Sequence, residues 1–254
     1  MQAFDLSGRV AVVTGGNGGI GLGMARGLAA AGASVVIAGR DQDKSLRAVG
    51  ELQQGGARAS AVEFDVRSKE SIEDLFSAAQ ERFGRVDILI TNAGTNIRKP
   101  PQDYTLDEWA EVLDINLRGT FLCAQAAYPH LVRAGGGKII TIGSMTSIFG
   151  ASFAAPYSAS KGGTVQLTKA LATAWAKDNI QVNAVLPGWI DTDLTRRARR
   201  EVAGLEERVQ ARTPQGRWGT PADLAGVGVF LASAASNFIT GVAIPVDGGY
   251  SSQA

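Results

Sequence analysis

The chain has 254 residues, a length that suits one large α/β domain or two small ones. Its formal net charge is +1, so no overall field attracts nucleic acid or an anionic membrane, and we expect neither as a partner. One cysteine and one histidine exclude an intramolecular disulfide and argue against a metal centre. We find neither a signal peptide nor an apolar run of about 18 residues, and therefore expect a cytoplasmic protein.

Seven short apolar runs, rich in β-branched residues, alternate with helix-length amphipathic stretches. Each run is almost continuously apolar, which is typical of strands buried on both faces of a parallel sheet. Without a linker or repeat, residues 1–254 are predicted to form a single α/β domain with helices on both faces. The expected strands are 9–15, 33–39, 59–66, 86–94, 137–144, 180–188 and 241–249. The expected helices include 43–54, 68–83, 107–133 and 221–234.

The first strand is followed by a glycine-rich segment, VVTGGNGGIGLGMARGLAAAG, that opens a helix. Gly15, Gly19 and Gly21 form the pattern G-x3-G-x-G, where G-x-G-x-x-G is commoner. Residues without a Cβ let the backbone approach a pyrophosphate, and the helix N-terminus supplies N–H donors and a positive dipole end. A turn that only packs the helix on the strand is the alternative. The position at the first strand–helix junction favours a dinucleotide site.

The end of the second strand, IAGRDQDK, indicates which dinucleotide binds. An acidic residue there would bind the ribose 2′-OH of NAD, but Gly39 stands in that position and Arg40 follows. A guanidinium could bind the 2′-phosphate of NADP in a bidentate manner or stack on the adenine. An ordinary exposed arginine is the alternative, and Asp41 and Asp43 add opposing charge. The segment favours NADP(H) over NAD(H).

A tyrosine and a lysine stand four residues apart in the segment YSASK, at Tyr157 and Lys161. On a helix this spacing places the phenol and the ammonium on one face. Interconverting an alcohol and a ketone requires a proton at oxygen while hydride moves at carbon. A phenol with a reference pKa near 10 is a weak base at neutral pH. A neighbouring ammonium and a cationic nicotinamide would lower that pKa, so Tyr157 is predicted to be the general acid/base.

Six motifs, in order along the chain, resemble those of the short-chain dehydrogenase/reductase family. The resemblance runs from about residue 6 to residue 249. It implies a doubly wound, Rossmann-like parallel sheet of about seven strands, nicotinamide-dependent hydride transfer and a homotetramer. The motifs are TGGNGGIG (14–21), TNAG (91–94), Asn116 in DINLRG, Ser144 in TIGSMTS, YSASK (157–161) and PGWIDT (187–192).

The resemblance also implies catalytic roles. Ser144 would donate a hydrogen bond to the substrate oxygen as charge develops there. Lys161 would in addition hold the ribose hydroxyls of the nicotinamide nucleotide, and Asn116 would anchor a water in a proton relay. The catalytic set is therefore Asn116, Ser144, Tyr157 and Lys161.

For the cofactor, the chain departs from the family pattern at two positions. Thr91 stands where the family often has Asn, and Gly18 replaces the usual basic residue of the glycine loop, so the preference for NADP(H) depends on Arg40. The cofactor-binding residues that the resemblance implies are Gly15, Asn17, Gly18, Gly19, Ile20, Gly21, Arg40, Asp65, Val66, Asn92, Ala93, Gly94, Tyr157, Lys161, Pro187, Gly188, Ile190 and Thr192.

The substrate is expected to contact Arg98, Met145 and Trp189. The segment NAGTNIRKP resembles sugar-acid enzymes of the family, such as gluconate 5-dehydrogenase and 2-deoxy-gluconate 3-dehydrogenase, so Arg98 is predicted to bind a substrate carboxylate. Members that act as glucose 1-dehydrogenase or 3-oxoacyl-carrier-protein reductase are alternatives. A dinucleotide-sensing regulator without enzymatic activity is disfavoured because Ser144, Tyr157 and Lys161 are all present.

Residues 189–219 form a long insertion, predicted to be a substrate lid. Four arginines at 196–200 could bind an anion or could simply be solvated. The spacing of the apolar residues predicts the inner face of one lid helix, with the arginines on its outer face. These apolar residues are Leu194, Ala198, Val202, Leu205 and Val209.

Overall fold

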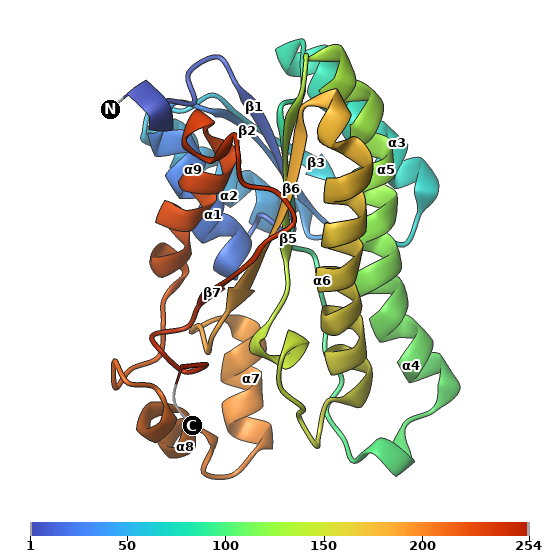
Figure 1. Cartoon of the computed structure of the whole chain (residues 1–254), viewed down its shortest axis with the longest axis vertical. Helices are drawn as coiled ribbons and strands as arrows, with labels where there is room; N and C mark the ends of the chain where they lie inside the picture. The colour runs from blue at the N-terminus through green and yellow to red at the C-terminus, as the bar shows by residue number, and fades with distance from the viewer. Residues whose placement is uncertain (1, 253–254) are drawn as a thin grey trace.

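The computed structural model describes residues 2–252, which form a seven-stranded parallel sheet (Figure 1). The strand order is β3-β2-β1-β4-β5-β6-β7. All seven predicted strands are confirmed, although each is shorter than its apolar run. The strands are β1 Val10–Thr14, β2 Ser34–Gly39, β3 Ala59–Glu63, β4 Ile88–Thr91, β5 Gly137–Ile142, β6 Ile180–Pro187 and β7 Ala243–Val246.

Helices cover both faces of the sheet, as the alternation of elements predicts. Figure 1 shows α1, α2 and α9 on one side and α3, α4, α5 and α6 on the other. The helices are α1 Gly19–Ala30, α2 Gln42–Gln54, α3 Lys69–Phe83, α4 Leu106–Leu113, α5 Gly119–Arg133, α6 Ala155–Trp175, α7 Asp193–Glu201, α8 Leu205–Arg212 and α9 Ala225–Ala232. Within residues 2–252, every helix is too short or too polar to span a membrane.

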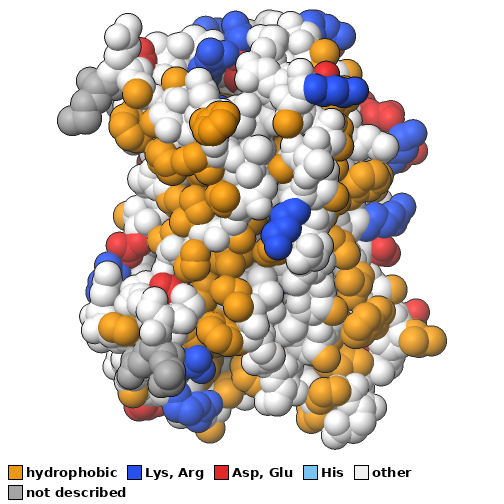
Figure 2. Space-filling view, in the orientation of Figure 1, with side chains coloured by type: hydrophobic (Ala, Val, Ile, Leu, Met, Phe, Trp, Pro, Cys, Tyr) orange, Lys and Arg blue, Asp and Glu red, His pale blue; other side chains and the backbone are white. Residues whose placement is uncertain are grey.

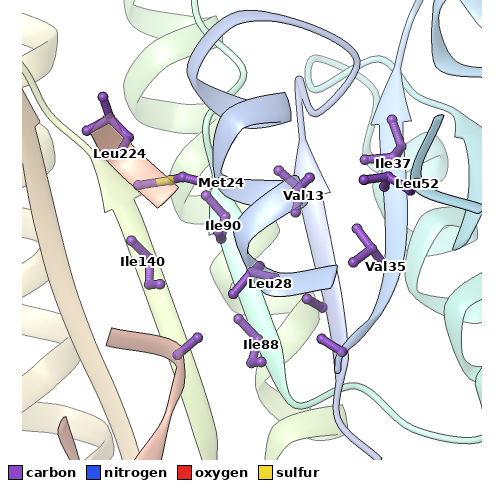
Figure 3. Close-up of a cluster of buried hydrophobic side chains, with 14 of the residues drawn as sticks. Val13, Met24, Leu28, Val35, Ile37, Leu52, Ile88, Ile90, Ile140 and Leu224 are labelled. Atoms are coloured by element: carbon purple, nitrogen blue, oxygen red, sulfur yellow. The ribbon is translucent and has the colours of Figure 1, made fainter. Parts of the chain in front are cut away.

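Two apolar cores hold the layers together because successive residues of a strand point to opposite faces. Val13 of β1 packs in the core under α1, together with Met24 and Leu28 of that helix (Figure 3). Val12, the preceding residue in β1, packs on the other face against α3 and α5, where Leu75 is fully buried. The continuous apolar runs of the sequence follow from this double burial.

The strand order reverses next to β1, which pairs with β2 on one side and with β4 on the other. The crossovers that leave β1 and β4 therefore diverge to opposite sides and open a crevice at the carboxyl ends of these strands. In open α/β sheets this is where ligands bind. The glycine loop after β1 and the residues after β4 meet at this crevice.

The long helix predicted at 107–133 is present but contains one wider turn. Between α4 and α5, residues Asp114–Arg118 form a π-helical turn. Gly119 follows this turn and packs tightly against the loop between β3 and α3, since a Cβ at Gly119 would lie 2.4 Å from Val66 Cγ2. π-turns of this kind often occur at functional sites.

Residues 189–219, predicted to be a substrate lid and here called the lid segment, differ from the single helix that their apolar spacing predicts. Helix α7 ends at Glu201, Gly204 adopts a left-handed conformation with φ of 65°, and α8 starts at Leu205. The break lets Ala198 of α7 and Val209 of α8 both pack against Trp218. The prediction of one helix is therefore wrong, because periodicity does not reveal the reversal at the glycine.

At the far edge of the sheet, β7 pairs only with β6 among the described strands. Figure 2 shows hydrophobic side chains gathered over the α9 and β7 part of the face in view. Phe238 is fully exposed and Val242 is 38% exposed in this region. The open edge thus carries apolar surface that the other described residues, within 2–252, leave uncovered.

Candidate active site

Tyr157 and Lys161 share one face of α6, as their spacing predicts. The Lys161 ammonium lies 5.7 Å from the centre of the Tyr157 ring and donates a 2.7 Å hydrogen bond to the carbonyl of Ile142 at the end of β5. Only 4% of Lys161 is exposed, and this burial lowers the pKa of its ammonium to about 8. The end of β5 therefore holds the Lys161 ammonium in place beside the Tyr157 ring.

The pKa of Tyr157 is raised, chiefly by burial. A hydrogen bond from Ser144 and the charge of Arg98 act in the opposite direction. Ser144 follows β5 and lies on the wall of the same cavity, where its hydroxyl accepts a 3.1 Å hydrogen bond from the Thr146 backbone. The side chains of Ser144, Tyr157 and Lys161 thus line one cavity, where an alcohol oxygen could be protonated or deprotonated.

Ser147 supports this arrangement, and the sequence analysis missed it. Its hydroxyl donates a 2.8 Å hydrogen bond to the Lys161 carbonyl and accepts one of 3.2 Å from the backbone of Ser144. It thereby ties the turn after β5 to α6. No pattern in the sequence distinguishes it from the neighbouring hydroxyl residues.

Asn116 is 1% exposed and lies behind the cavity, in the π-helical turn. Its amide group brackets the Thr95 backbone, accepting from its N–H at 2.8 Å and donating to its carbonyl at 3.0 Å. The same side-chain amide donates to the Ser160 hydroxyl, and the main-chain carbonyl of Asn116 accepts from the Thr120 hydroxyl at 2.8 Å. Asn116 therefore joins the loop after β4 to α6. Its part in a proton relay remains a prediction.

The second feature of the crevice is a groove along the glycine loop, here called the glycine-loop groove. The cavity that contains Tyr157 is here called the inner cavity. The groove and the inner cavity are joined, because five residues line both of them: Ile20, Asn92, Gly94, Thr192 and Leu194. Most predicted cofactor residues line one of the two spaces. Gly15, Asn17, Gly18, Gly19, Arg40, Asp65, Val66 and Ala93 line the groove, and Pro187, Gly188 and Ile190 line the inner cavity.

The glycine loop is closed so tightly that side chains do not fit at two of its positions. A Cβ at Gly21 would lie 2.4 Å from the Gly15 carbonyl and 2.5 Å from Asn92 Nδ2. Asn92 in turn donates a 2.9 Å hydrogen bond to that carbonyl, which ties β4 to the loop. Gly15 itself has a φ of 62°. Because the loop is packed without side chains at these positions, its backbone lies at the wall of the groove, where a dinucleotide would place its diphosphate.

We expect the substitution Gly21→Ala to weaken dinucleotide binding at least about tenfold and to lower the melting temperature, because the added methyl collides with backbone at an estimated cost of about 1–3 kcal/mol. Gly50→Ala is the matched control, since Gly50 lies in α2 with nothing within 4 Å of its virtual Cβ. There alanine should stabilise the helix by up to about 1 kcal/mol. Thermal melting and cofactor titration check both. A Gly21→Ala protein that melts no lower than wild type would contradict this packing.

Two of the predicted cofactor contacts in the groove have partners within the protein. Asp65 forms an ion pair with Arg67, and this guanidinium lowers the pKa of the Asp65 carboxyl to about 2. Asn17 donates a 3.0 Å hydrogen bond to the Ser45 hydroxyl. A Cβ at Gly39 would lie 2.4 Å from Asn17 Nδ2. An acidic side chain at residue 39, the typical NAD contact, is therefore sterically excluded while Asn17 holds this position.

The predicted substrate contacts Arg98, Met145 and Trp189 all line the inner cavity. Arg98 also has protein partners: its guanidinium is 3.1 Å from the Glu201 carboxylate and donates to the Leu194 carbonyl at 3.3 Å. Both partners belong to lid helix α7. Arg98 thus links the loop after β4 to the lid.

Among the arginines of the lid segment, three on α7 contact other side chains of the protein, and two on α8 line the inner cavity. Arg196 pairs with Asp191, Arg197 pairs with Glu201, and Arg199 stacks 3.8 Å above the Trp218 ring. These contacts favour the interpretation of the 196–200 cluster as a lid surface and not as an anion site. Two arginines on α8 that were not among the predicted substrate contacts also line the inner cavity: Arg208 and Arg212.

Comparison with known proteins shows the family of the chain. The family model described as enoyl-(acyl carrier protein) reductase matches residues 15–251. The 2-dehydro-3-deoxy-D-gluconate 5-dehydrogenase of Escherichia coli K12 is 40% identical over 251 residues, which are 98% of each chain. The gluconate 5-dehydrogenase of Gluconobacter oxydans is 39% identical, covering 97% of this chain and 96% of that one.

A solved structure has the same fold over its full length. The crystal structure of a gluconate 5-dehydrogenase from Burkholderia cenocepacia, in complex with NADP and tartrate, superimposes with a TM-score of 0.94 at 40% identity, covering 100% of this chain and 99% of that one. The family match, the full-length relatives and the strand order all agree with the motifs that surround Tyr157 and the glycine loop. The chain belongs to the short-chain dehydrogenase/reductase family and is an NAD(P)-dependent oxidoreductase that acts on CH–OH groups.

Proposed function

We propose that the protein interconverts a secondary alcohol and a ketone on a sugar acid of the gluconate or deoxygluconate type, with NADP(H) as cofactor. The observation that carries this proposal is the inner cavity, which is lined by both Tyr157 and Arg98 and in which the charge of Arg98 acts to lower the pKa of Tyr157. A site that combines an acid/base with a guanidinium suits a hydroxy acid. Relatives named for gluconate and deoxygluconate substrates are about 40% identical over the full length.

In this mechanism Tyr157 moves the proton at the substrate oxygen. A nicotinamide held by the residues of the groove and the inner cavity would supply the hydride chemistry at the substrate carbon. In the oxidative direction the Tyr157 phenolate takes the hydroxyl proton as the C–H bond is broken, and in the reductive direction the phenol returns it. Lys161 stabilises the phenolate by its charge, and Ser144 donates a hydrogen bond to the substrate oxygen as its charge grows.

The residues of the glycine-loop groove fit a dinucleotide with a 2′-phosphate. Gly15 lines the groove with backbone alone, Gly21 lets the loop close against the Gly15 carbonyl, and Arg40 lines the groove beyond β2. Residue 39 is glycine, so the groove carries no acid at the position where one would repel the phosphate. These features support the preference for NADP(H) over NAD(H).

Arg98 is proposed to bind the substrate carboxylate with the donors that remain beside its contact to Glu201. A guanidinium has five N–H donors in a planar fork, so it can serve two carboxylates at once. Arg212 is the second candidate for this role, because it lines the same cavity and its guanidinium lies 4.5 Å from the centre of the Tyr250 ring.

Initial rates test the proposal. Gluconate, 2-deoxygluconate, glucose and simple secondary alcohols are compared with NADP⁺ and NAD⁺, and the keto partners and an acetoacetyl thioester are run in reverse. Turnover of a sugar acid, faster with NADP⁺, is the expected result. Turnover only of glucose or of the thioester would refute the sugar-acid assignment, and tight cofactor binding without any turnover would point to a sensor.

We expect Arg98→Ala to raise the KM for the sugar acid by about 10- to 100-fold, since a charged hydrogen bond of about 1.5–3 kcal/mol is lost. The KM for glucose, which has no carboxylate, should change little. Steady-state kinetics on both substrates measures the difference.

Two further variants separate substrate binding from support of the lid. Glu201→Gln breaks the same ion pair but keeps Arg98, so its KM should stay near the wild-type value. An equal rise in KM for Glu201→Gln would show that Arg98 acts only through the lid. An effect confined to Arg212→Ala would assign the carboxylate to Arg212.

A further inference from the structure

The glycine-loop groove contains a lysine that the glycine-loop pattern does not reveal. Residue 18 in this loop is glycine, yet a charged group lies beside it. A Cβ at Gly18 would lie 2.9 Å from the ammonium nitrogen of Lys44 and 3.0 Å from its Cε. Lys44, from α2, therefore places a cation where a longer side chain at residue 18 would begin.

The position of Lys44 is set by the cap of its helix. Asp41 precedes α2 and accepts a 2.9 Å hydrogen bond from the Lys44 backbone N–H. Because the Asp41 carboxylate caps the positive end of α2, its charge is partly balanced there. Lys44 and Arg40 then line the same end of the groove, together with Gly18. Two cations thus line the groove just after β2, where folds of this kind hold the adenosine ribose.

Lys44 has a counter-ion on the opposite wall of the groove. Its ammonium lies 3.2 Å from the carboxylate of Asp193, the first residue of lid helix α7. Both residues line the groove, so the ion pair spans it from α2 to the lid. The side chains are 39% and 77% exposed, and an ion pair this accessible to water is weak.

We infer that Lys44 is the second cationic ligand of the NADP(H) 2′-phosphate, beside Arg40, and that Asp193 is its exchangeable counter-ion. This rests on the proposed preference for NADP(H). A phosphate with a charge near −2 competes well against one exposed carboxylate for an ammonium. With NADP(H) bound, Lys44 leaves Asp193 for the phosphate. With NAD(H), the ion pair to the lid persists. Lys44 therefore supplies the charge that Gly18 lacks.

The inference predicts opposite effects for the two partners. Lys44→Gln should weaken the binding of NADP⁺ about five- to tenfold and change that of NAD⁺ by less than about twofold, because only the former has a 2′-phosphate. Asp193→Asn should tighten NADP⁺ binding about two- to threefold, because Lys44 no longer has to leave an anion. Both effects should shrink at high salt.

Equilibrium titrations followed by tryptophan fluorescence or calorimetry measure these constants, with no need for a substrate. Adenosine 2′,5′-bisphosphate and adenosine 5′-monophosphate serve as further probes, since they differ only in the 2′-phosphate. Lys69→Gln is the matched control: it removes an exposed lysine on α3 that pairs with Glu73, away from the groove. It should leave all four constants unchanged.

The outcomes separate this inference from the proposal beneath it. If wild-type protein prefers NADP⁺ and Arg40→Gln removes that preference while Lys44→Gln keeps it in full, the role of Lys44 is refuted and the cofactor proposal stands. Equal weakening of NADP⁺ and NAD⁺ by Lys44→Gln would also refute it. A wild-type protein that binds NAD⁺ as well as NADP⁺ would overturn both.

Discussion

The substitution Tyr157→Phe should lower kcat by about 10²- to 10⁴-fold and leave the dissociation constant for NADP⁺ within about twofold of wild type. It removes one oxygen, the atom that exchanges the proton with the substrate in the proposed mechanism. The ring that fills the cavity wall beside Lys161 remains, so packing and cofactor binding should be preserved. Steady-state rates and a cofactor titration on the same protein sample test this.

Tyr250→Phe provides a matched control for that experiment. Tyr250 also lines the inner cavity, but its neighbours are the Phe149 ring and the Arg212 guanidinium, not Lys161. We expect its kcat to stay within a few-fold of wild type. If Tyr157→Phe retained more than about a tenth of the wild-type kcat, the acid/base role would have to be given to another group.

Replacing the buried lysine, by contrast, should damage activity and improve stability at once. Lys161→Met removes the ammonium that lowers the pKa of Tyr157 in the mechanism, so kcat should fall by about 10²-fold or more. The cofactor-free protein should nonetheless gain roughly 1–3 kcal/mol in its free energy of unfolding at pH 7, because an ammonium that is 4% exposed no longer has to be desolvated.

The pH dependence of this gain has a definite sign. The pKa of Lys161 falls from 10.5 to about 8 on folding, because burial disfavours the charged form. Below about pH 8 the unfolded and folded states are both protonated, and the full cost of burying the charge destabilises the wild type. As the pH rises from about 8 towards 10.5, the folded state has released the proton and the cost disappears. The advantage of Lys161→Met should therefore be largest below pH 8 and vanish near pH 10.5.

Lys138→Met separates the two effects. Lys138 is also buried and its pKa is also lowered to about 8, but it lies at the start of β5, away from the catalytic end of that strand. It donates a 2.8 Å hydrogen bond to the Asn237 side chain. Its substitution should leave kcat unchanged. Chemical denaturation between pH 6 and 10 measures the stabilities, and a Lys161→Met protein less stable than wild type at pH 7 would contradict the argument.

Most of the fold could be predicted from local patterns. Strands buried on both faces produce unbroken apolar runs, and all seven runs became neighbouring strands of one sheet. The glycine loop and the spacing of Tyr157 and Lys161 were equally local, since one turn of helix decides whether two residues share a face. The limits of each strand were less accurate, because the apolar run continues into residues that turn away from the sheet.

What the sequence concealed lies where distant segments meet. The break in the lid at Gly204 depends on how α7 and α8 pack around Trp218, and apolar spacing is compatible with one straight helix as well. The partner of Arg98 is Glu201, 103 residues further along the chain. Ion pairs of this kind leave no periodic signal, so the sequence could indicate which arginines exist but not which ones face the cavity.

The sequence by itself determined the family and the sheet, and it predicted the acid/base pair, because these depend on hydrophobic period, backbone conformation at glycines and residue spacing on one helix. Only the tertiary structure decided the environment of each charge. It buried Lys161 against the Ile142 carbonyl, and it brought Lys44 over Gly18 and across to Asp193, 149 residues away. The strength of a charge depends on what surrounds it in space, and that arrangement exists only after the chain has folded.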